Sequence, residues 1–293
     1  MSSAQTAITV VDLHKSYDDY EAVGGVSFEV AEGEIFGLLG PNGAGKTTTV
    51  EILEGYRISS SGSVSVLGFN PAERPRELRE RVGIVLQSSG MYRHVRVREA
   101  VAHWAGLYPH PRDVDEVLGI VGLDDAVQAT ALVRTLSGGQ QRRLDLALAL
   151  IGDPDLIFLD EPTTGFDPAA RRAAWATIKR LRDLGKTVLL TTHYLEDAQE
   201  LCDRVAIIKN GRILAEGPPS TLSEASARYR VSWRDATGAL ISEEVDDPTE
   251  LLHRLTSEAI ARGESLADCS VIRPSLEDVY LELTADEVSE ALQ

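Results

Sequence analysis

Five consecutive residues have the composition of an anion-binding helix start. The segment reads Leu136-Ser137-Gly138-Gly139-Gln140, and a helix-like run over 141–150 follows it directly. Free backbone N–H groups, the Ser137 hydroxyl and the positive end of a helix dipole would meet at this point. The sequence therefore predicts that the segment contacts a phosphate group.

A second phosphate site lies much earlier in the chain and matches the phosphate-binding loop pattern in full. Its residues are Gly40-Pro41-Asn42-Gly43-Ala44-Gly45-Lys46-Thr47, followed by Thr48. Glycines let the backbone wrap the phosphates, so Lys46 is expected to reach the β- and γ-phosphates and Thr47 to ligate Mg²⁺. Because one nucleotide needs one cradle, the segment at 136–140 is predicted to serve an ATP that a second chain holds.

Acidic and amide side chains stand at the ends of two apolar runs. Asp160 and Glu161 end the run 156–159, where a carboxylate beside a phosphate loop can hold the nucleotide's Mg²⁺. Asp160 is predicted to orient the metal or its waters, and Glu161 to polarise the attacking water. Gln87 closes the run 82–86, and its amide is predicted to contact Mg²⁺ or that water. The alternatives are a helix cap, a plain surface acid or a surface amide.

Two aromatic side chains complete the predicted site. His193 follows the run 187–192, where an imidazole could hydrogen-bond the γ-phosphate, although a lone histidine is more often structural. Tyr17 could stack on adenine. The alternatives are that Tyr17 is a core or surface residue, or that the nearby Tyr20 makes the adenine contact instead. Asp167, just past the Asp-Glu pair, could contact a partner chain.

The order of the elements predicts an α/β fold. Continuous apolar runs at 35–39, 156–159, 187–190 and 205–208 are typical of strands buried on both faces, with helices near 168–184 and 194–202 between them. The strand 26–30 alternates and indicates an antiparallel sheet. Residues 88–150 lack such runs and are interpreted as a helical insert. Beyond a boundary near 216–220, residues 221–293 are predicted to form a small α+β domain, with a capped helix from Asp247.

The composition argues against some classes of function. The net charge of −17 argues against a general nucleic-acid binder, because phosphate neutralisation needs a basic surface. Cys202 and Cys269 have no metal-ligand spacing, and both are predicted to pack as small hydrophobic residues. The sequence contains no apolar run long enough for a transmembrane helix and no signal peptide, so a membrane role is expected to need a partner.

Together these motifs resemble the ATP-binding subunit of an ABC transporter over residues 8–217. The phosphate loop is shared by many NTPases, whereas the signature at 136–140 is specific to this family. The resemblance implies a P-loop NTPase (RecA-like) core at 1–217 with an antiparallel β subdomain and a helical insert at about 88–150. It also implies a head-to-tail dimer with two ATP molecules between the chains, Glu161 as general base and His193 as switch residue.

The resemblance further implies a separately encoded membrane permease, docked at a groove near Gln87 and residues 88–94 on the cytoplasmic face of the membrane. Residues 191–198 and 274–281 are similar to drug-efflux ATPases of the daunorubicin-resistance type, which predicts export of a drug or another hydrophobic molecule. Three positions depart from the family pattern. Phe166 replaces a usual Leu, Leu86 replaces a common Pro and Asp18 replaces a common Gly.

Two other functions compete with transport. A soluble ABC ATPase acting as an assembly or mechanochemical factor would carry two cassettes or a long coiled coil, and the sequence has neither. A nucleotide-gated binding module without hydrolysis would lack the base or the switch residue, yet Glu161 and His193 are both present.

Overall fold

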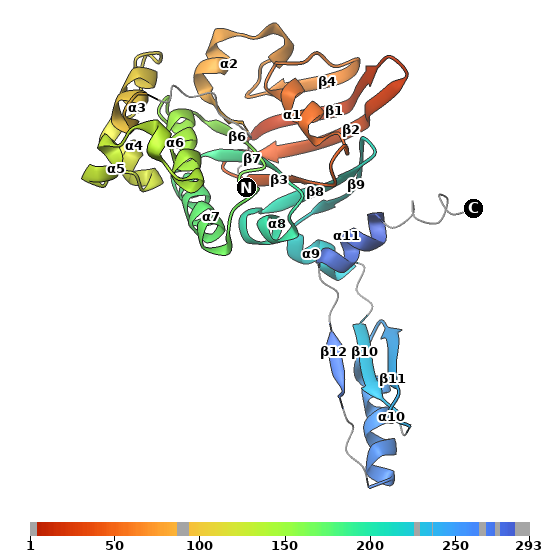
Figure 1. The fold of residues 1–293 in the computed structure, drawn as a ribbon. Helices are drawn as coiled ribbons and strands as arrows, with labels where there is room; N and C mark the ends of the chain where they lie inside the picture. Colours follow the sequence, from red (N-terminus) through yellow and green to blue (C-terminus); the bar gives the residue numbers. More distant parts are fainter. Residues whose placement is uncertain are drawn as a thin grey trace. The chain divides into compact units, whose positions relative to one another are not determined.

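Two compact units make up the chain, one ending at Gly217 and the other beginning at Pro218. The computed structural model (Figure 1) describes residues 5–86, 94–225, 229–235, 237–263, 268–272 and 276–284. The division falls within the Gly- and Pro-containing segment 216–220. The first unit carries the phosphate loop, the signature segment, the Asp160–Glu161 pair and His193.

A six-stranded sheet organises the first unit. Its spatial order is β5 (Val82–Val85), β6 (Leu156–Asp160), β7 (Thr187–Thr192), β3 (Ile35–Leu39), β8 (Arg204–Lys209) and β9 (Arg212–Gly217). The first five strands are parallel, and β9 pairs antiparallel with β8. Every residue of β3 and β7 is buried, as their continuous apolar runs indicate. The predicted α/β fold is confirmed, and the edge strand β9 is an addition to it.

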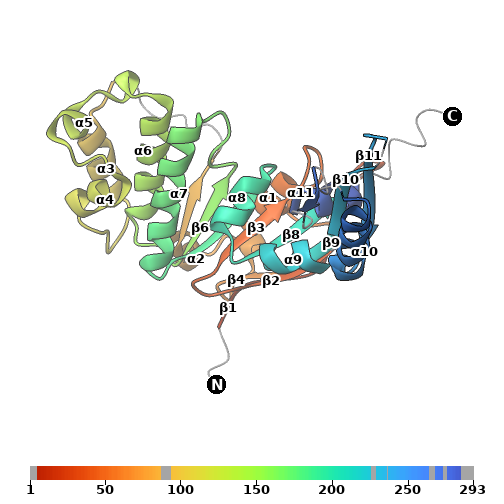
Figure 2. The same ribbon diagram turned by 90° about the horizontal axis from the view of Figure 1, so that it is seen from below.

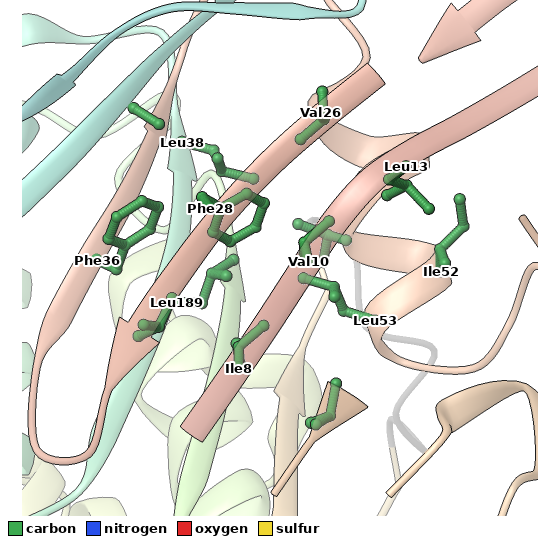
Figure 3. Close-up of a cluster of buried hydrophobic side chains, with 14 of the residues drawn as sticks. Ile8, Val10, Leu13, Val26, Phe28, Phe36, Leu38, Ile52, Leu53 and Leu189 are labelled. Atoms are coloured by element: carbon green, nitrogen blue, oxygen red, sulfur yellow. The ribbon is translucent and has the colours of Figure 1, made fainter. Parts of the chain in front are cut away.

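An antiparallel sheet packs on this core. It consists of β2 (Tyr20–Ala31), β1 (Thr6–Tyr17) and β4 (Ser61–Val66), in that order. Side chains from β1, β2, β3 and α1 (Lys46–Leu53) converge in Figure 3. The rings of Phe28 and Phe36 stack with centroids 5.3 Å apart, which joins the two sheets. The helix that follows the phosphate loop is therefore anchored by its apolar side chains Ile52 and Leu53 in the same core.

Helices occupy the middle of the first unit. They are η1 (Pro71–Glu73), α2 (Arg76–Arg81), α3 (Val97–Ala105), α4 (Val114–Val121), α5 (Ala126–Thr130), η2 (Val133–Thr135) and α6 (Gly138–Leu150). Figures 1 and 2 show α3, α4 and α5 gathered beside α6 at one end of the unit. Asp113 caps α4, whose C-terminus is at Gly122 with φ of 70°. After β6 the chain continues through α7 (Pro168–Asp183) and α8 (Leu195–Leu201).

In its described residues, the second unit contains a three-stranded antiparallel sheet and three helices. The sheet order is β11 (Leu240–Val245), β10 (Tyr229–Arg234) and β12 (Ser270–Ile272). Val231 and Trp233 of β10 pack against Leu251 and Leu255 of α10 (Pro248–Ala261). Asp247 caps α10, since its carboxylate accepts a hydrogen bond from the Thr249 N–H. The helices α9 (Pro219–Ala225) and α11 (Leu276–Thr284) contact each other.

The two cysteines differ in their surroundings. Cys202 is buried as predicted, whereas Cys269 is exposed, so the prediction that both are packed in the core is wrong for Cys269. Cys269 directly precedes β12, which is an edge strand of this sheet as far as the described residues show. Among the described residues, no helix has both the length and the apolar character needed to cross a membrane.

Candidate functional site

The phosphate loop connects β3 to α1 and needs glycine at two close approaches. A Cβ atom at Gly40 would lie 2.2 Å from the Ile208 carbonyl oxygen, and one at Gly45 would lie 2.5 Å from the Ala22 oxygen. Gly45 also has φ of 100°, a conformation that side chains rarely adopt. No side chain caps the N-terminus of α1, so the N–H groups of its first turn face the loop for an anion to accept.

Lys46 is turned inward. Its side-chain ammonium donates hydrogen bonds to the carbonyl oxygens of Gly40 at 2.7 Å and Pro41 at 3.0 Å. Only 5% of the residue is exposed. Burial lowers the pKa of Lys46, while the charges of Glu161 and Asp160 act in the opposite direction. The phosphate loop and the end of β6 thus share one electrostatic site.

Thr191 of β7 contacts the Asp160 carboxylate and the backbone N–H of Glu161 at the end of β6. The Thr191 hydroxyl donates to Asp160 Oδ1 at 2.6 Å and accepts the Glu161 N–H at 3.0 Å. Glu161 has φ of 45°, in the left-handed region that non-glycine residues rarely occupy. Such a conformation persists only where surrounding contacts hold it.

His193 lies beside Glu161, as its position at a strand end predicts. Its Nδ1 is 3.1 Å from Glu161 Oε1, and the other carboxylate oxygen accepts a hydrogen bond from the Thr164 hydroxyl at 3.1 Å. The start of the phosphate loop lies close by, because the Gly40 N–H donates to the Thr192 carbonyl at 3.3 Å. Lys46, Asp160, Glu161 and His193 therefore gather at one edge of the sheet.

The signature segment faces a different space. Ser137 caps α6: its hydroxyl accepts the Gln140 N–H at 3.3 Å, and Gln140 Oε1 accepts the Ser137 N–H at 2.9 Å. A Cβ atom at Gly138 or Gly139 would meet nothing within 4 Å, so both glycines present open backbone. These residues line a hollow of about 700 Å³ together with residues 164–167. No residue of the phosphate loop lines it.

Comparison with known proteins agrees with this geometry. The family model described as "ABC transporter" matches residues 23–164. A protein named "Nod factor export ATP-binding protein I" from Burkholderia pseudomallei (strain 1710b) is 42% identical, covering 94% of this chain and 96% of its own length. The chain belongs to the ABC transporter family. Another ABC protein of that name, from Sinorhizobium fredii, is 38% identical over 99% of this chain and 89% of its own.

Solved ABC cassettes have the same fold. The structure titled as cbiO1 from Clostridium perfringens is 28% identical with a TM-score of 0.68, and it covers 74% of this chain and 90% of that one. A dimeric cassette, MJ0796 bound to ADP and Pi, is 25% identical with a TM-score of 0.63 over 72% of this chain and 98% of its own. The present chain is accordingly an ATPase that binds adenine nucleotides.

Two of the predicted site residues need separate comment. Gln87 lies outside the described residues, as do residues 88–93, so its predicted contacts remain predictions.

Tyr17 ends β1 and is 36% exposed, with Lys15 Nζ 5.0 Å and the Arg57 guanidinium 5.5 Å from its ring centroid. Asp18 has φ of 50°, a backbone conformation that glycine adopts more readily than aspartate.

Asp167 has a structural task in this ABC ATPase. Its carboxylate accepts the N–H groups of Ala169 and Ala170, both at 2.9 Å, and so caps α7. Residues 165–167, including Phe166, line the same hollow as the signature. Cap and partner contact are compatible roles, because the hollow is open to the surface.

Sequence reasoning missed two residues that hold the site. Asp197 is fully buried on α8 and accepts hydrogen bonds from Trp175 at 2.8 Å and Thr192 at 3.0 Å, as well as from Thr163. Arg142, on the signature helix, donates to the carbonyl oxygens of Leu86 and Asp160. Asp197 lies within the segment 191–198, but its contacts with Thr163 and Trp175, like those of Arg142, join distant segments of the chain that no local spacing encodes.

A groove of about 680 Å³ lies elsewhere on the first unit. Its lining includes Leu53, Tyr56 and Leu86 from the core and Trp104 and Tyr108 from the helical insert. The half-buried Glu54 also lines it. Burial raises the pKa of Glu54 to about 8, and the charges of Asp160 and Glu51 act in the same direction. The groove therefore combines apolar and aromatic surface with one carboxyl group that favours its protonated form.

Proposed function

We propose that two copies of this chain bind two ATP molecules between them, head to tail, and hydrolyse them to drive export through a separate membrane-spanning subunit. One observation carries this proposal. Lys46, Glu161 and His193 gather at one edge of the sheet, whereas the signature lines a hollow to which no phosphate-loop residue contributes. A phosphate contact by the signature therefore needs a second chain.

The proposed hydrolysis uses the observed contacts. Glu161 accepts a proton from the water that attacks the γ-phosphate, while the bond from that phosphorus to the bridging oxygen breaks and ADP leaves. His193 contacts the γ-phosphate from the adjacent strand end. Lys46 turns from the carbonyl oxygens of Gly40 and Pro41 to the β- and γ-phosphates, which are stronger acceptors for an ammonium group. Ser137 of the second chain closes the site.

The oxygen donors beside the loop suit Mg²⁺. The Thr47 hydroxyl is exposed at the start of α1, and the Asp160 carboxylate lies at the end of β6. Hard oxygen ligands of this kind fit Mg²⁺, which would neutralise negative charge on the nucleotide's phosphates. Gln87 is proposed as a further ligand. Tyr17 is proposed to stack on adenine.

Two substitutions test the composite site. Glu161→Gln should abolish phosphate release from Mg-ATP while leaving ATP bound in a stable dimer on size-exclusion chromatography. Ser137→Arg should leave ATP binding to the monomer intact and abolish turnover, because the large side chain blocks closure of the partner's site. Wild-type turnover in the Ser137→Arg protein would contradict the two-chain site.

The groove lined by Tyr56 and Trp104 is proposed to receive the membrane subunit on the cytoplasmic side. Tyr56 is 58% exposed, and Tyr56→Glu should prevent co-purification with that subunit without lowering the basal ATPase rate. Leu214→Glu, on β9 outside the groove, is the control because Leu214 is also exposed, at 41%. Retention of the membrane subunit by Tyr56→Glu would favour a soluble assembly or mechanochemical role.

The substrate is proposed to be a hydrophobic or amphipathic small molecule. The curated relatives carry the name Nod factor export, and the motif at 191–198 is similar to drug-efflux ATPases. Vesicles that contain the chain and its membrane subunit should accumulate a lipophilic dye only with Mg-ATP. ATP-dependent movement of a polar solute alone would contradict this substrate class.

A further inference from the structure

One arginine connects the signature helix to the ends of two core strands. The Arg142 guanidinium, on the second turn of α6, donates to the carbonyl oxygen of Leu86 just after β5. It also donates to the Asp160 oxygen at 2.6 Å and lies 3.4 Å from the Glu161 oxygen. A single planar group thus spans the backbone at two adjacent strand ends, an arrangement that the rigid fork of arginine suits.

These contacts are made in a partly buried setting. Burial lowers the pKa of Arg142, with the charges of Asp145 and Asp160 acting against it. A buried cation is costly unless acceptors surround it, and the three carbonyl oxygens supply those acceptors. The position of Arg142 is therefore set by the strand ends, and the strand ends are in turn held by Arg142.

The contacts of Arg142 help to hold Glu161 in an unfavourable main-chain conformation. Its left-handed backbone, with φ of 45°, is unfavourable for a residue that carries a Cβ atom. Thr191 holds the N–H side of this residue, through its carbonyl oxygen at 3.2 Å and its hydroxyl at 3.0 Å. Arg142 holds the carbonyl side. Without it, the peptide that follows Asp160 is free to relax, and the Glu161 carboxylate moves with it.

We propose that Arg142 is a positioning residue for ATP hydrolysis. It holds Glu161 in its left-handed conformation and ties this residue to the helix that begins at Ser137. The inference rests on the proposed function, in which Glu161 is the base at one ATP and Ser137 closes on the other. Through Arg142, the base of one composite site is linked to the wall of the next within a single chain.

The test compares steady-state phosphate release by full-length protein with Mg-ATP. Arg142→Gln should lower kcat by roughly 10- to 100-fold, the scale expected for a small misplacement of a catalytic group, and should leave KM within about twofold. Arg142→Lys should give an intermediate kcat, because one ammonium cannot span both strand ends. Equal kcat values for wild type and both variants would overturn the inference.

Arg180→Gln is the matched control. Arg180, on α7, also donates from the core to a carbonyl oxygen of the helical insert, that of Ile120 at 3.0 Å, but Ile120 lies on α4 and not at a strand end. Its kcat should stay within about twofold of wild type. An equal loss in Arg180→Gln and Arg142→Gln would indicate general loosening of the insert and would overturn the specific role.

A double-mutant cycle separates positioning from folding. Single-turnover assays with protein in excess measure the rate of ATP cleavage. Introducing Arg142→Gln should lower this rate in the wild-type background. It should not lower the residual rate of Glu161→Gln further, because that variant lacks the carboxylate that Arg142 positions. Additive losses would overturn the inference. If Glu161→Gln alone kept full turnover, the proposed base would be wrong instead. Should Arg142→Gln fail to fold, Arg142→Lys carries the same cycle, with the same additive outcome against it.

Discussion

Glu54 is predicted to make the stability of this protein fall as the pH rises through neutrality. It directly follows α1, its carboxyl group is half-buried, and no donor in the described part of the chain forms a hydrogen bond with that group. Burial raises its pKa from 4.5 to about 8. Between these two values the folded protein keeps a proton on Glu54 that the unfolded chain releases.

The sign and size of the effect follow from this difference. Since the folded state binds the extra proton, the contribution is fully present below pH 4.5 and is lost as the pH rises through 8. The pKa difference corresponds to roughly 5 kcal/mol of folding free energy, of which roughly 3 kcal/mol falls between pH 5.5 and 8.5. Glu54→Gln removes the titrating group and should remove this slope.

Urea unfolding without nucleotide, at several pH values from 5.5 to 8.5, measures the effect. The free energy of unfolding of Glu54→Gln minus that of wild type should rise with pH across this range. Glu77→Gln, an exposed change on α2, corrects for the loss of one negative charge. Parallel curves for wild type and Glu54→Gln, after this correction, would refute the reasoning.

Three further substitutions have defined outcomes. Gly45→Ala places a methyl group 2.5 Å from the Ala22 oxygen at φ of 100°, so ATP affinity measured by calorimetry should fall at least ~10-fold; unchanged affinity would contradict the close approach. Asp197→Ala removes the acceptor of the Trp175 and Thr192 donors and should destabilise the first unit by about 3 kcal/mol in urea, whereas a loss below about 1 kcal/mol would contradict its role. Leu255→Ala removes a 6% exposed side chain from the second unit, so hydrogen exchange in α10 should accelerate by the equivalent of about 3 kcal/mol, with phosphate release unaltered; unchanged exchange would contradict its core position.

Strands that are buried on both faces could be predicted from the sequence more reliably than strands at the edges of the sheets. The runs that form β3 and β7 are apolar throughout, so their type followed directly from composition. The edge strands β4 and β9 were not predicted. Ser61-Gly62-Ser63 begins β4 with polar and flexible residues, and β9 alternates exposed with half-buried positions at the open edge of the sheet.

The same limit applies to the site. Lys46, Asp160 and His193 could be predicted because each follows a strand of the same sheet, and parallel strand ends meet at one edge. Arg142 and Asp197 could not. Arg142 contacts segments 56 and 18 residues away, and the importance of these contacts depends on β5 and β6 being neighbours, which no local spacing encodes. The predicted burial of Cys269 is wrong for a related reason, because the burial of a residue beside an edge strand depends on which segments pack next to that strand.

The backbone and the carboxylate of Glu161 have different surroundings. This difference suits the role proposed for Glu161, that of a base that acts only when a nucleotide is bound. The backbone is fixed from both sides, by Thr191 on β7 and by Arg142 on α6. The carboxylate is held by the side chains of His193 and Thr164, each at 3.1 Å. A γ-phosphate that attracts the His193 imidazole would weaken one of these two hydrogen bonds without disturbing the backbone. Under the proposed function, in which Glu161 is the base, this would let the carboxylate approach water while the backbone stays in place, and one imidazole would couple nucleotide contact to proton acceptance.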